Sequence, residues 1–307
     1  MISPFHAVYR PWALALLVLL GTGSSRPLAA GAPVQWPPLG DVTHPERHPG
    51  KMIWADLVTP DLSVAERFYG GMFGWKFETL QTGVKEDVLV TVNGRQVGCL
   101  LQRPMPAGEP RQSTWLAFFA VQDVDAARSV ALKNGAKSLW GPKTFEGHGR
   151  QAVLSDPEGA VFGMLESSTG DPSDDLAAPG EWIWSAALVP DPAQDAAFYQ
   201  KLFDYDVFAL PSEGTAEHLI LSSDDLARAS VNTMPGDASR RHPHWLSFIR
   251  VTDTEAAAAT AVTLGGRILV KPHVDRHGGK TALIADPAGA PIGLMEWNDS
   301  STKMEPK

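Results

Sequence analysis

The alternation of apolar and polar residues along the chain predicts short strands and amphipathic helices. Residues 52–58 form a mainly apolar run of strand length. Asp61 then stands where a helix cap is expected, and apolar residues recur at helical spacing from there to about residue 72. Turn sequences such as Asn93-Gly94 separate the three strand-like runs that follow, at residues 75–80, 87–92 and 96–101.

The same order of elements starts again in the next part of the chain. Residues 115–121 read as a strand, and a helix is predicted from Asp123 to about Asn134, where Gly135 closes it. Further strands follow, the last two at residues 150–155 and 161–166. The predicted unit is therefore strand, helix and three strands, used twice within the first half of the chain.

An internal repeat relates the two halves of the chain at a constant offset of 130 residues. The matched pairs include Trp54 and Trp184, Asp61 and Asp191, Phe68-Tyr69 and Phe198-Tyr199, Trp115-Leu116 and Trp245-Leu246, Asp123 and Asp253, and Asp156-Pro157 and Asp286-Pro287. One offset that holds over this span without a gap indicates duplication. The unit is then used four times, and the polar, Pro- and Gly-containing segment 168–180 is predicted to link the copies.

In these motifs the sequence resembles the vicinal oxygen chelate superfamily, which includes glyoxalase I, extradiol dioxygenases and bleomycin-resistance proteins. The resemblance rests on the strand before each Pro-Asp, the helical Phe-Tyr, and the Asp-Pro-x-Gly-Ala before each last strand. It covers residues 50–167 and 181–297. It implies an α+β fold of two tandem domains, each a curved mixed sheet that forms a cup, with helices outside and the ligand or metal inside.

The positions where the resemblance implies metal ligands hold none in this sequence. Family enzymes place a His seven residues before each helix-starting Asp, and a carboxylate four residues after the glycine of Asp-Pro-x-Gly. The residues here are Trp54, Leu116 and Gly163 in the first copy and Trp184, Leu246 and Gly293 in the second. None of these side chains offers a divalent cation an oxygen or an imidazole nitrogen. We therefore expect no metal and no other cofactor.

Other candidate ligand groups are weaker. Glu166 and Glu296 end the strands concerned, but strand alternation places them on the face opposite Gly163 and Gly293, where we expect solvated carboxylates. The histidines fall in predicted loops without a supporting carboxylate or cysteine, and solvated side chains are the simpler interpretation. They are His242 with His244, and His273 with His277.

Applying the same alternation predicts which side chains line each cup. The candidate ligand-binding residues are Trp54, Asp56, Leu116, Phe118 and Gly163 in the first cup, and Trp184, Leu246, Phe248, Arg250 and Gly293 in the second. These walls are mostly apolar and aromatic, the two glycines are expected to leave room, and such surfaces suit a flat or apolar molecule. The alternative is that the tryptophans fill the cups as ordinary core.

Asp56 and Arg250 are the polar exceptions on these walls. Asp56 has no counterpart in the second copy, which carries Ala186 there, so the two cups are expected to differ in role. A carboxylate among aromatic side chains has a raised pKa and suits a general base or a site for a cationic ligand. A backbone N–H at the strand end is an equally simple partner for it.

The N-terminal residues have the order of a secretory signal. Arg10 precedes the apolar run 12–20, and small residues follow up to a cleavage site at Ala30 or Ala32. This run is shorter than the ~20 residues needed to cross a bilayer. We therefore predict a signal peptide at 1–32, an extended lead-in at 33–49, a tail at 298–307, export to a periplasm and no stable membrane insertion.

Composition limits the remaining classes of function. The formal charge of −9 makes nucleic acid an unfavourable partner, and the single cysteine, Cys99, excludes an internal disulfide. The first hypothesis is an exported, metal-free protein that binds a small aromatic or apolar molecule, as a monomer or homodimer. The alternatives are an enzyme of this fold (lyase, isomerase or dioxygenase) with an unrecognised metal set or Asp56 as base, and a scaffold module.

Overall fold

The computed structural model describes residue 36 and residues 38–81, 86–103, 112–211, 216–236, 242–275 and 279–297. The predicted signal peptide and the C-terminal tail lie outside these residues. No helix among the described residues has the length and apolar character to cross a membrane.

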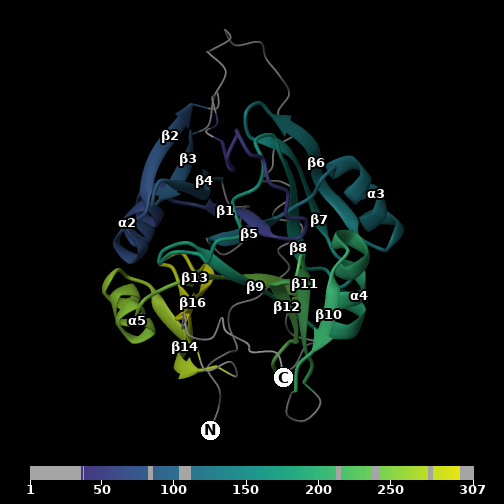
Figure 1. Cartoon of the computed structure of the whole chain (residues 1–307). Coiled ribbons are helices and arrows are strands. Elements are labelled where there is room, and N and C mark those ends of the chain that lie inside the picture. Colours follow the sequence, from purple (N-terminus) through teal and green to yellow (C-terminus); the bar gives the residue numbers. More distant parts are fainter. Residues whose placement is uncertain are drawn as a thin grey trace.

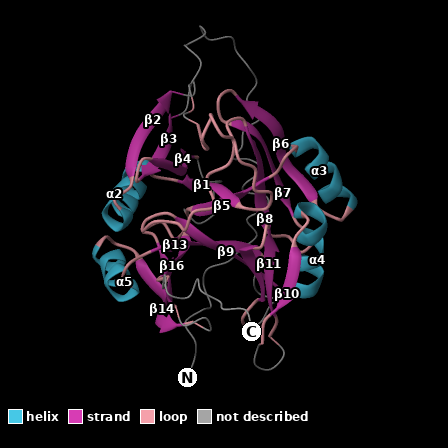
Figure 2. Cartoon of the chain, viewed as in Figure 1, coloured by secondary structure: helices cyan, strands magenta, loops and turns pink. Residues whose placement is uncertain are grey.

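The first domain consists of one eight-stranded mixed sheet and two helices (Figures 1 and 2). Its elements are β1 (Met52–Thr59), α2 (Leu62–Phe73), β2 (Lys76–Gln81), β3 (Glu86–Val92), β4 (Arg95–Gln102), β5 (Thr114–Ala120), α3 (Val124–Lys133), β6 (Lys137–Phe145), β7 (Gly149–Ser155) and β8 (Val161–Ser167). The strand order is β2-β3-β4-β1-β5-β8-β7-β6, so the first strands of the two units, β1 and β5, pair antiparallel at the centre.

The second domain repeats this architecture element by element. It contains β9 (Trp182–Val189), α4 (Pro192–Phe203), β10 (Asp206–Ala209), β11 (His218–Ser223), β12 (Leu226–Thr233), β13 (His244–Arg250), α5 (Thr254–Thr263), β14 (Arg267–Val274), β15 (Lys280–Ala285) and β16 (Pro291–Met295). Its strand order, β10-β11-β12-β9-β13-β16-β15-β14, is that of the first sheet. The predicted α+β fold with four strand–helix–three-strand units is confirmed.

Each helix begins at an aspartate that the repeat identified. In every case a side-chain oxygen accepts a hydrogen bond from the backbone N–H three residues later, at 2.8–3.1 Å. This contact satisfies one of the N–H groups that a helix start leaves without an intrahelical partner, and it is worth about 1 kcal/mol per helix. The four caps are Asp61, Asp123, Asp191 and Asp253.

The two domains pack through the faces of their sheets that carry the helices. One shared core joins β5, β7, β8 and α3 to β9, β11, β12 and α4, and a second joins β1, β3, β4 and α2 to β13, β15, β16 and α5. Figure 1 shows α2 beside α5 on one flank and α3 beside α4 on the other. The opposite, concave face of each sheet is thereby directed away from the other domain.

Paired hydrogen bonds across this interface account for several of the repeated residues. The Tyr199 hydroxyl donates to Asp156 Oδ2 at 2.9 Å, and Trp245 Nε1 donates to that hydroxyl at 2.8 Å. The other side matches it, because Tyr69 donates to Asp286 and accepts from Trp115. Each tyrosine therefore reaches the Asp-Pro turn of the other domain, which no local sequence pattern reveals.

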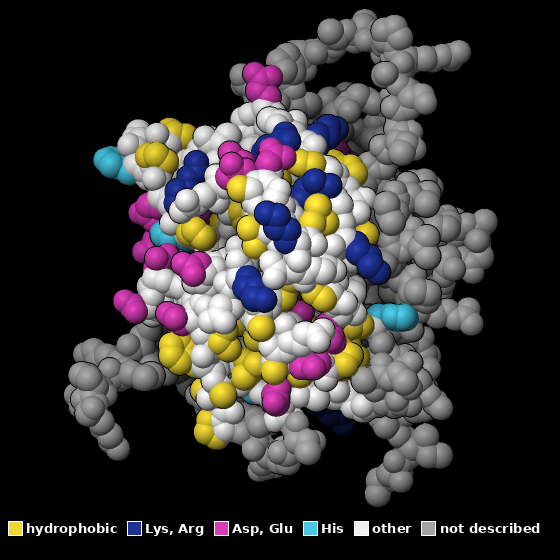
Figure 3. Space-filling model, turned by 90° about the vertical axis from the view of Figure 1, so that its right-hand side faces the viewer, with side chains coloured by type: hydrophobic (Ala, Val, Ile, Leu, Met, Phe, Trp, Pro, Cys, Tyr) yellow, Lys and Arg dark blue, Asp and Glu magenta, His cyan; other side chains and the backbone are white. Residues whose placement is uncertain are grey.

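Charges of both signs are mixed on the flank formed by α3 and α4. Figure 3 shows acidic and basic side chains interspersed with apolar ones on this side. A continuous basic stripe, as a phosphate backbone would require, is not seen among the described residues of this flank.

The segment predicted as an extended lead-in packs against the first sheet. Trp36 and Leu39 pack against the apolar cluster on the concave face of the first sheet. Further along, Glu46 forms an isolated bridge with Asp171 of the linker, and the Lys51 ammonium lies 2.9 Å from an Asp174 carboxylate oxygen. The segment is polar and rich in proline, so no periodic pattern indicated that it would cover a sheet.

Candidate ligand-binding faces

Strand alternation correctly predicted which side chains share the concave face of the first sheet. Trp54, Leu116 and Phe118 all belong to one buried cluster there, together with strand neighbours on either side. Trp54 and Phe118 are each 1% exposed and Leu116 is 4% exposed. These side chains therefore fill the first cup as core, which is the alternative interpretation given above for its tryptophan.

The second sheet presents the same residue types with greater exposure. Trp184 and Phe248 are half-buried, whereas their counterparts in the first sheet are fully buried. Leu188 is also half-buried, and Leu246 is 7% exposed. Phe208, which pairs with Ile220 at the sheet edge, is 55% exposed. The second concave face is an apolar and aromatic surface that remains partly accessible.

The lead-in accounts for much of this difference. The Trp36 ring lies over the first concave face, with its centroid 6.1 Å from that of Trp54 and 4.7 Å from that of His148. Figure 1 shows the lead-in between the two arms of the upper sheet. Its backbone fits closely, since a Cβ on Gly147 would lie 3.1 Å from the Trp36 carbonyl oxygen.

Gly163 and Gly293 do not leave the open space that the sequence suggested. A Cβ built on Gly163 would lie 2.2 Å from a ring carbon of Phe118, and one on Gly293 would lie 2.0 Å from a ring carbon of Phe248. In both sheets the phenyl ring therefore lies directly on the glycine. The room that a glycine offers is used by a neighbouring side chain, which local sequence could not show.

Asp56 is tied to an indole rather than to a backbone N–H. Trp54 Nε1 donates to Asp56 Oδ1 at 2.7 Å, and the carboxyl group is 8% exposed. Burial raises the pKa of Asp56 to about 7, although the indole hydrogen bond favours the charged form. A pair formed by Arg103 and Asp87, 3.0 Å apart, lies on the same side of the sheet.

His148 is a buried polar residue of the first cup that strand alternation did not include among the wall residues. It is 1% exposed, its ring is 4.6 Å from that of Trp54, and burial lowers its pKa to about 4. Its Nε2 lies 2.9 Å from the amide nitrogen of Gln151. Because that amide nitrogen only donates, the neutral ring carries its proton on Nδ1.

Polar groups border the aromatic wall of the second face. Trp184 Nε1 donates to Ser230 Oγ at 3.1 Å, Asn232 Nδ2 donates to the same oxygen at 3.0 Å, and Asn232 also contacts His218. Arg250, predicted as a polar member of this wall, donates to the carbonyls of Ala177 at 2.8 Å and Trp297 at 3.4 Å. The guanidinium thus connects the wall to the linker and to the end of the chain that the structure describes.

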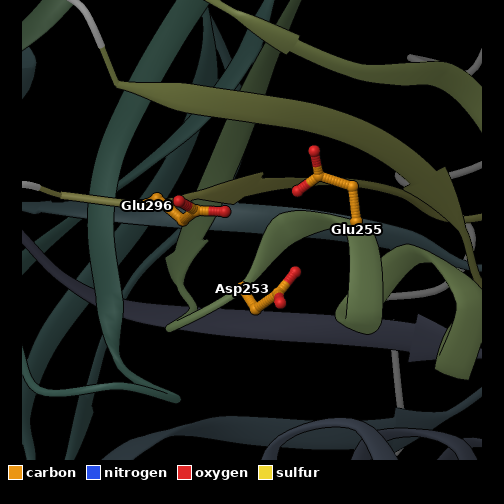
Figure 4. Close-up of side chains that lie close together, drawn as sticks. All are labelled: Asp253, Glu255 and Glu296. Carbon is orange, nitrogen blue, oxygen red and sulfur yellow. The ribbon is translucent and has the colours of Figure 1, made fainter.

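Among the described residues, the carboxylates of Asp253, Glu255 and Glu296 lie close enough to one another to be considered as a metal site (Figure 4). Glu296 Oε1 accepts hydrogen bonds from the backbone N–H and the hydroxyl of Thr254, and Lys280 pairs with Glu255 at 2.9 Å. In the first domain Glu166 likewise accepts from the N–H of Val124. Both glutamates lie opposite the glycines, as predicted, but they complete helix caps and are half-buried instead of solvated.

The histidines considered as ligands form no such group among the described residues. His242 is exposed, and the rings of His244 and His273 contact the carbonyls of His242 and Lys271. His277 lies outside the residues that the structure describes.

The residues of the concave faces do not fit the metal that the fold family implies. The implied ligand positions are occupied by indole, isobutyl and hydrogen, the Trp54 N–H is already committed to Asp56, and a phenyl ring fills the space over Gly163. Carboxylate and imidazole donors are what a divalent cation requires, and these positions supply neither.

Comparison with known proteins agrees with this fold. A family model described as a glyoxalase-like domain matches residues 52–165 and 184–295. A putative glyoxylase, CFP32, of Mycobacterium tuberculosis is 26% identical over 255 residues, covering 82% of this chain and 96% of the relative. The anthracycline biosynthesis protein DauV of Streptomyces sp. is 26% identical over 264 residues, covering 82% and 95%.

Solved structures show the same architecture at low sequence identity. The Mn(II)-bound glyoxalase from Novosphingobium aromaticivorans matches with a TM-score of 0.58 and 16% identity, covering 81% of this chain and 82% of that one. A homoprotocatechuate 2,3-dioxygenase from Brevibacterium fuscum matches with a TM-score of 0.58 and 14% identity, covering 83% and 73%. The chain belongs to the glyoxalase-like family of the vicinal oxygen chelate superfamily, as two tandem domains.

Proposed function

We propose that this protein is an exported small-molecule binding protein that captures a flat, largely apolar molecule on the concave face of its second sheet without a resident metal ion. The observation that carries the proposal is the unequal exposure of matched residues. Trp184 and Phe248 are half-buried, whereas Trp54 and Phe118 are each 1% exposed. A partly exposed aromatic surface on a concave face gains free energy when a ligand covers it.

The surroundings of this face favour an aromatic ligand with polar substituents. Indole and phenyl rings stack on other aromatic rings at ~0.5–1.5 kcal/mol per contact beyond simple burial. Ser230 and Asn232 add hydroxyl and amide groups beside Trp184. Two curated relatives are named for anthracycline biosynthesis, which supports the proposal that members of this family handle such molecules.

Export is part of the proposal and rests on the N-terminal sequence. The order of Arg10, the apolar run 12–20 and the small residues before Ala30 and Ala32 supports cleavage there. Amino-terminal sequencing of the protein from the periplasmic fraction of a Gram-negative host should find a start at residue 31 or 33. A start at Met1 in the cytoplasmic fraction would contradict this part.

Binding is tested by equilibrium dialysis with 1-naphthol, using the full chain purified without chelator or added metal. We expect saturable binding, and Trp184→Ala should weaken it by about tenfold or more because the central stacking surface is lost. Phe248→Ala should act in the same direction.

The first sheet provides a matched control within the same chain. Trp54→Ala changes the same residue type at the equivalent position of the covered face, and it should leave the affinity of the second-face naphthol site within about twofold. Absence of saturable binding, or equal losses in Trp54→Ala and Trp184→Ala, would contradict the assignment to the second face.

A second candidate function is an enzyme of this fold that uses Asp56 as general base. The raised pKa of Asp56, about 7 through burial, favours it, because such a carboxylate accepts a proton at neutral pH. Loss of a turnover activity in Asp56→Asn with unchanged naphthol binding would support this candidate. An activity that persists in Asp56→Asn would refute it.

A further inference from the structure

The strap, defined as Trp36 and residues 38–40, is attached to the first domain and to the linker by few polar contacts. Gln96 Nε2 donates to the Pro38 carbonyl at 3.0 Å, and the Leu39 N–H donates to Thr169 Oγ1 at 2.9 Å. Trp36 itself is only half-buried. Its other described contacts are aromatic, with Trp54 and Phe145 each at 6.1 Å and His148 at 4.7 Å.

Two residues that contact the strap, His148 and Gln96, each carry a buried polar atom that has no hydrogen-bond partner among the described residues. Both His148 Nδ1 and Gln96 Oε1 are buried in this way. A buried polar atom without a partner makes the closed arrangement less stable by the free energy of its desolvation. Native structures rarely keep such an atom unless a ligand, water or another conformation satisfies it.

The Trp36 ring occupies the place that a planar ligand would take. It is a flat bicyclic group that lies against the His148 ring at an interplanar angle of 37° and meets Trp54 nearly edge-on at 69°. The His148 ring against which it lies has a donor to offer, because His148 Nδ1 carries the proton and meets no partner among the described residues. A bicyclic arene with a hydroxyl group offers a ring for the aromatic contacts and an oxygen that accepts from His148 Nδ1.

We propose that the strap is a displaceable lid, that Trp36 holds the first cup closed as an internal stand-in for a ligand, and that a planar hydroxyarene enters this cup by replacing the Trp36 ring. This inference deepens the proposed function, since it adds a second, gated site for the same class of molecule. It does not depend on binding at Trp184.

The single cysteine reports directly on this cup. Cys99 is 1% exposed, belongs to the cluster that the strap covers, and pairs in register with Asp56. Its alkylation under native conditions is therefore expected to require opening of the first cup. Displacement of the strap can therefore be measured as the rate at which the Cys99 sulfur is alkylated.

The experiment compares iodoacetamide labelling of Cys99 in the full-length protein and in Trp36→Ala. We expect Trp36→Ala to label about tenfold faster or more, because the aromatic contacts that hold the strap are gone. Saturating 1-naphthol should slow labelling of this variant back toward the wild-type rate by refilling the vacancy. Thr169→Ala, which weakens the strap and leaves the ring in place, should accelerate labelling several-fold.

Two controls separate lid opening from other effects. Trp184→Ala removes the matched indole from the second sheet and should leave the rate of Cys99 labelling unchanged. Loss of naphthol binding at the second face therefore does not test whether the strap opens. Urea unfolding of each variant shows whether faster labelling merely follows lower global stability. Equal rates in Trp36→Ala and wild type, rates that track the unfolding free energy, or no protection by 1-naphthol would overturn the proposal.

Discussion

Asp195 is a buried acid at the domain interface, and its replacement by asparagine should make the protein more stable at neutral pH. It lies in the first turn of α4, is 0% exposed, and its side-chain oxygens meet no hydrogen-bond donor among the described residues. Burial raises its pKa to about 9, and the adjacent Asp156 carboxylate acts in the same direction. At pH 7 Asp195 is therefore protonated beside the Asp156 carboxylate. The equivalent position in the first copy is Ala65.

The sign and size of the effect follow from proton linkage. The pKa of Asp195 is higher in the folded protein than the ordinary value of 3.8. Stability from this group is therefore fully present below about pH 4 and is lost progressively as pH rises toward 9. At ~1.4 kcal/mol for each pH unit, the three units between pH 4 and pH 7 correspond to at most about 4 kcal/mol.

The asparagine side chain of the Asp195→Asn variant cannot ionise, so it places no charge beside the Asp156 carboxylate at any pH. The free energy of unfolding of Asp195→Asn should equal that of the wild type near pH 4 and exceed it by up to about 4 kcal/mol at pH 7.

The assay is urea unfolding of both proteins at unit steps from pH 4 to pH 8, with the difference in unfolding free energy plotted against pH. Asp206→Asn is the matched control, because Asp206 is exposed at the start of β10 and its replacement should change stability by less than about 0.5 kcal/mol at every pH. A difference that stays constant with pH, or a variant less stable than the wild type at pH 7, would refute the reasoning.

Three further outcomes are expected. Tyr199→Phe removes one of the two hydroxyl groups that join the domains, so the Asp156 carboxylate loses a buried donor. The free energy of unfolding in urea titrations should fall by ~1–3 kcal/mol. An unchanged urea midpoint would contradict this. Gly163→Ala places a methyl group 2.2 Å from the phenyl ring above it and should cost ~1–3 kcal/mol, whereas Gly293→Ala should cost less because the half-buried ring of its own sheet has space to move. MnCl2 at millimolar concentration should leave the thermal midpoint of the EDTA-dialysed protein unchanged; a rise of several degrees would show a bound ion.

The fold was largely predictable because its determinants are local and occur repeatedly. Cap residues such as Asp61 and Asp191, the turn glycines and strand alternation all act within a few residues, and the duplication provides each observation twice. Alternation also grouped Trp54 with Leu116 and Phe118 on one face of the first sheet, where all three belong to one buried cluster. Predictions that depended only on strand parity therefore agree with the structure.

The differences arise where residues distant in sequence meet. Nothing near Trp36 indicates that it covers a sheet, so the greater burial of the first cup could not be inferred. The bond from Tyr69 to Asp286 spans 217 residues, and Asp195 is unusual only because the fold brings Asp156 beside it. These features follow from domain packing, which the local pattern does not encode.

The central claim is that the concave faces bind an aromatic molecule and no metal ion. A crystal structure of the protein grown with 1-naphthol and MnCl2, with anomalous data collected near the manganese edge, tests it most directly. The account predicts naphthol density against Trp184 and Phe248 and no anomalous peak on either concave face. A manganese ion coordinated there, or an empty second face at saturating naphthol, would contradict it.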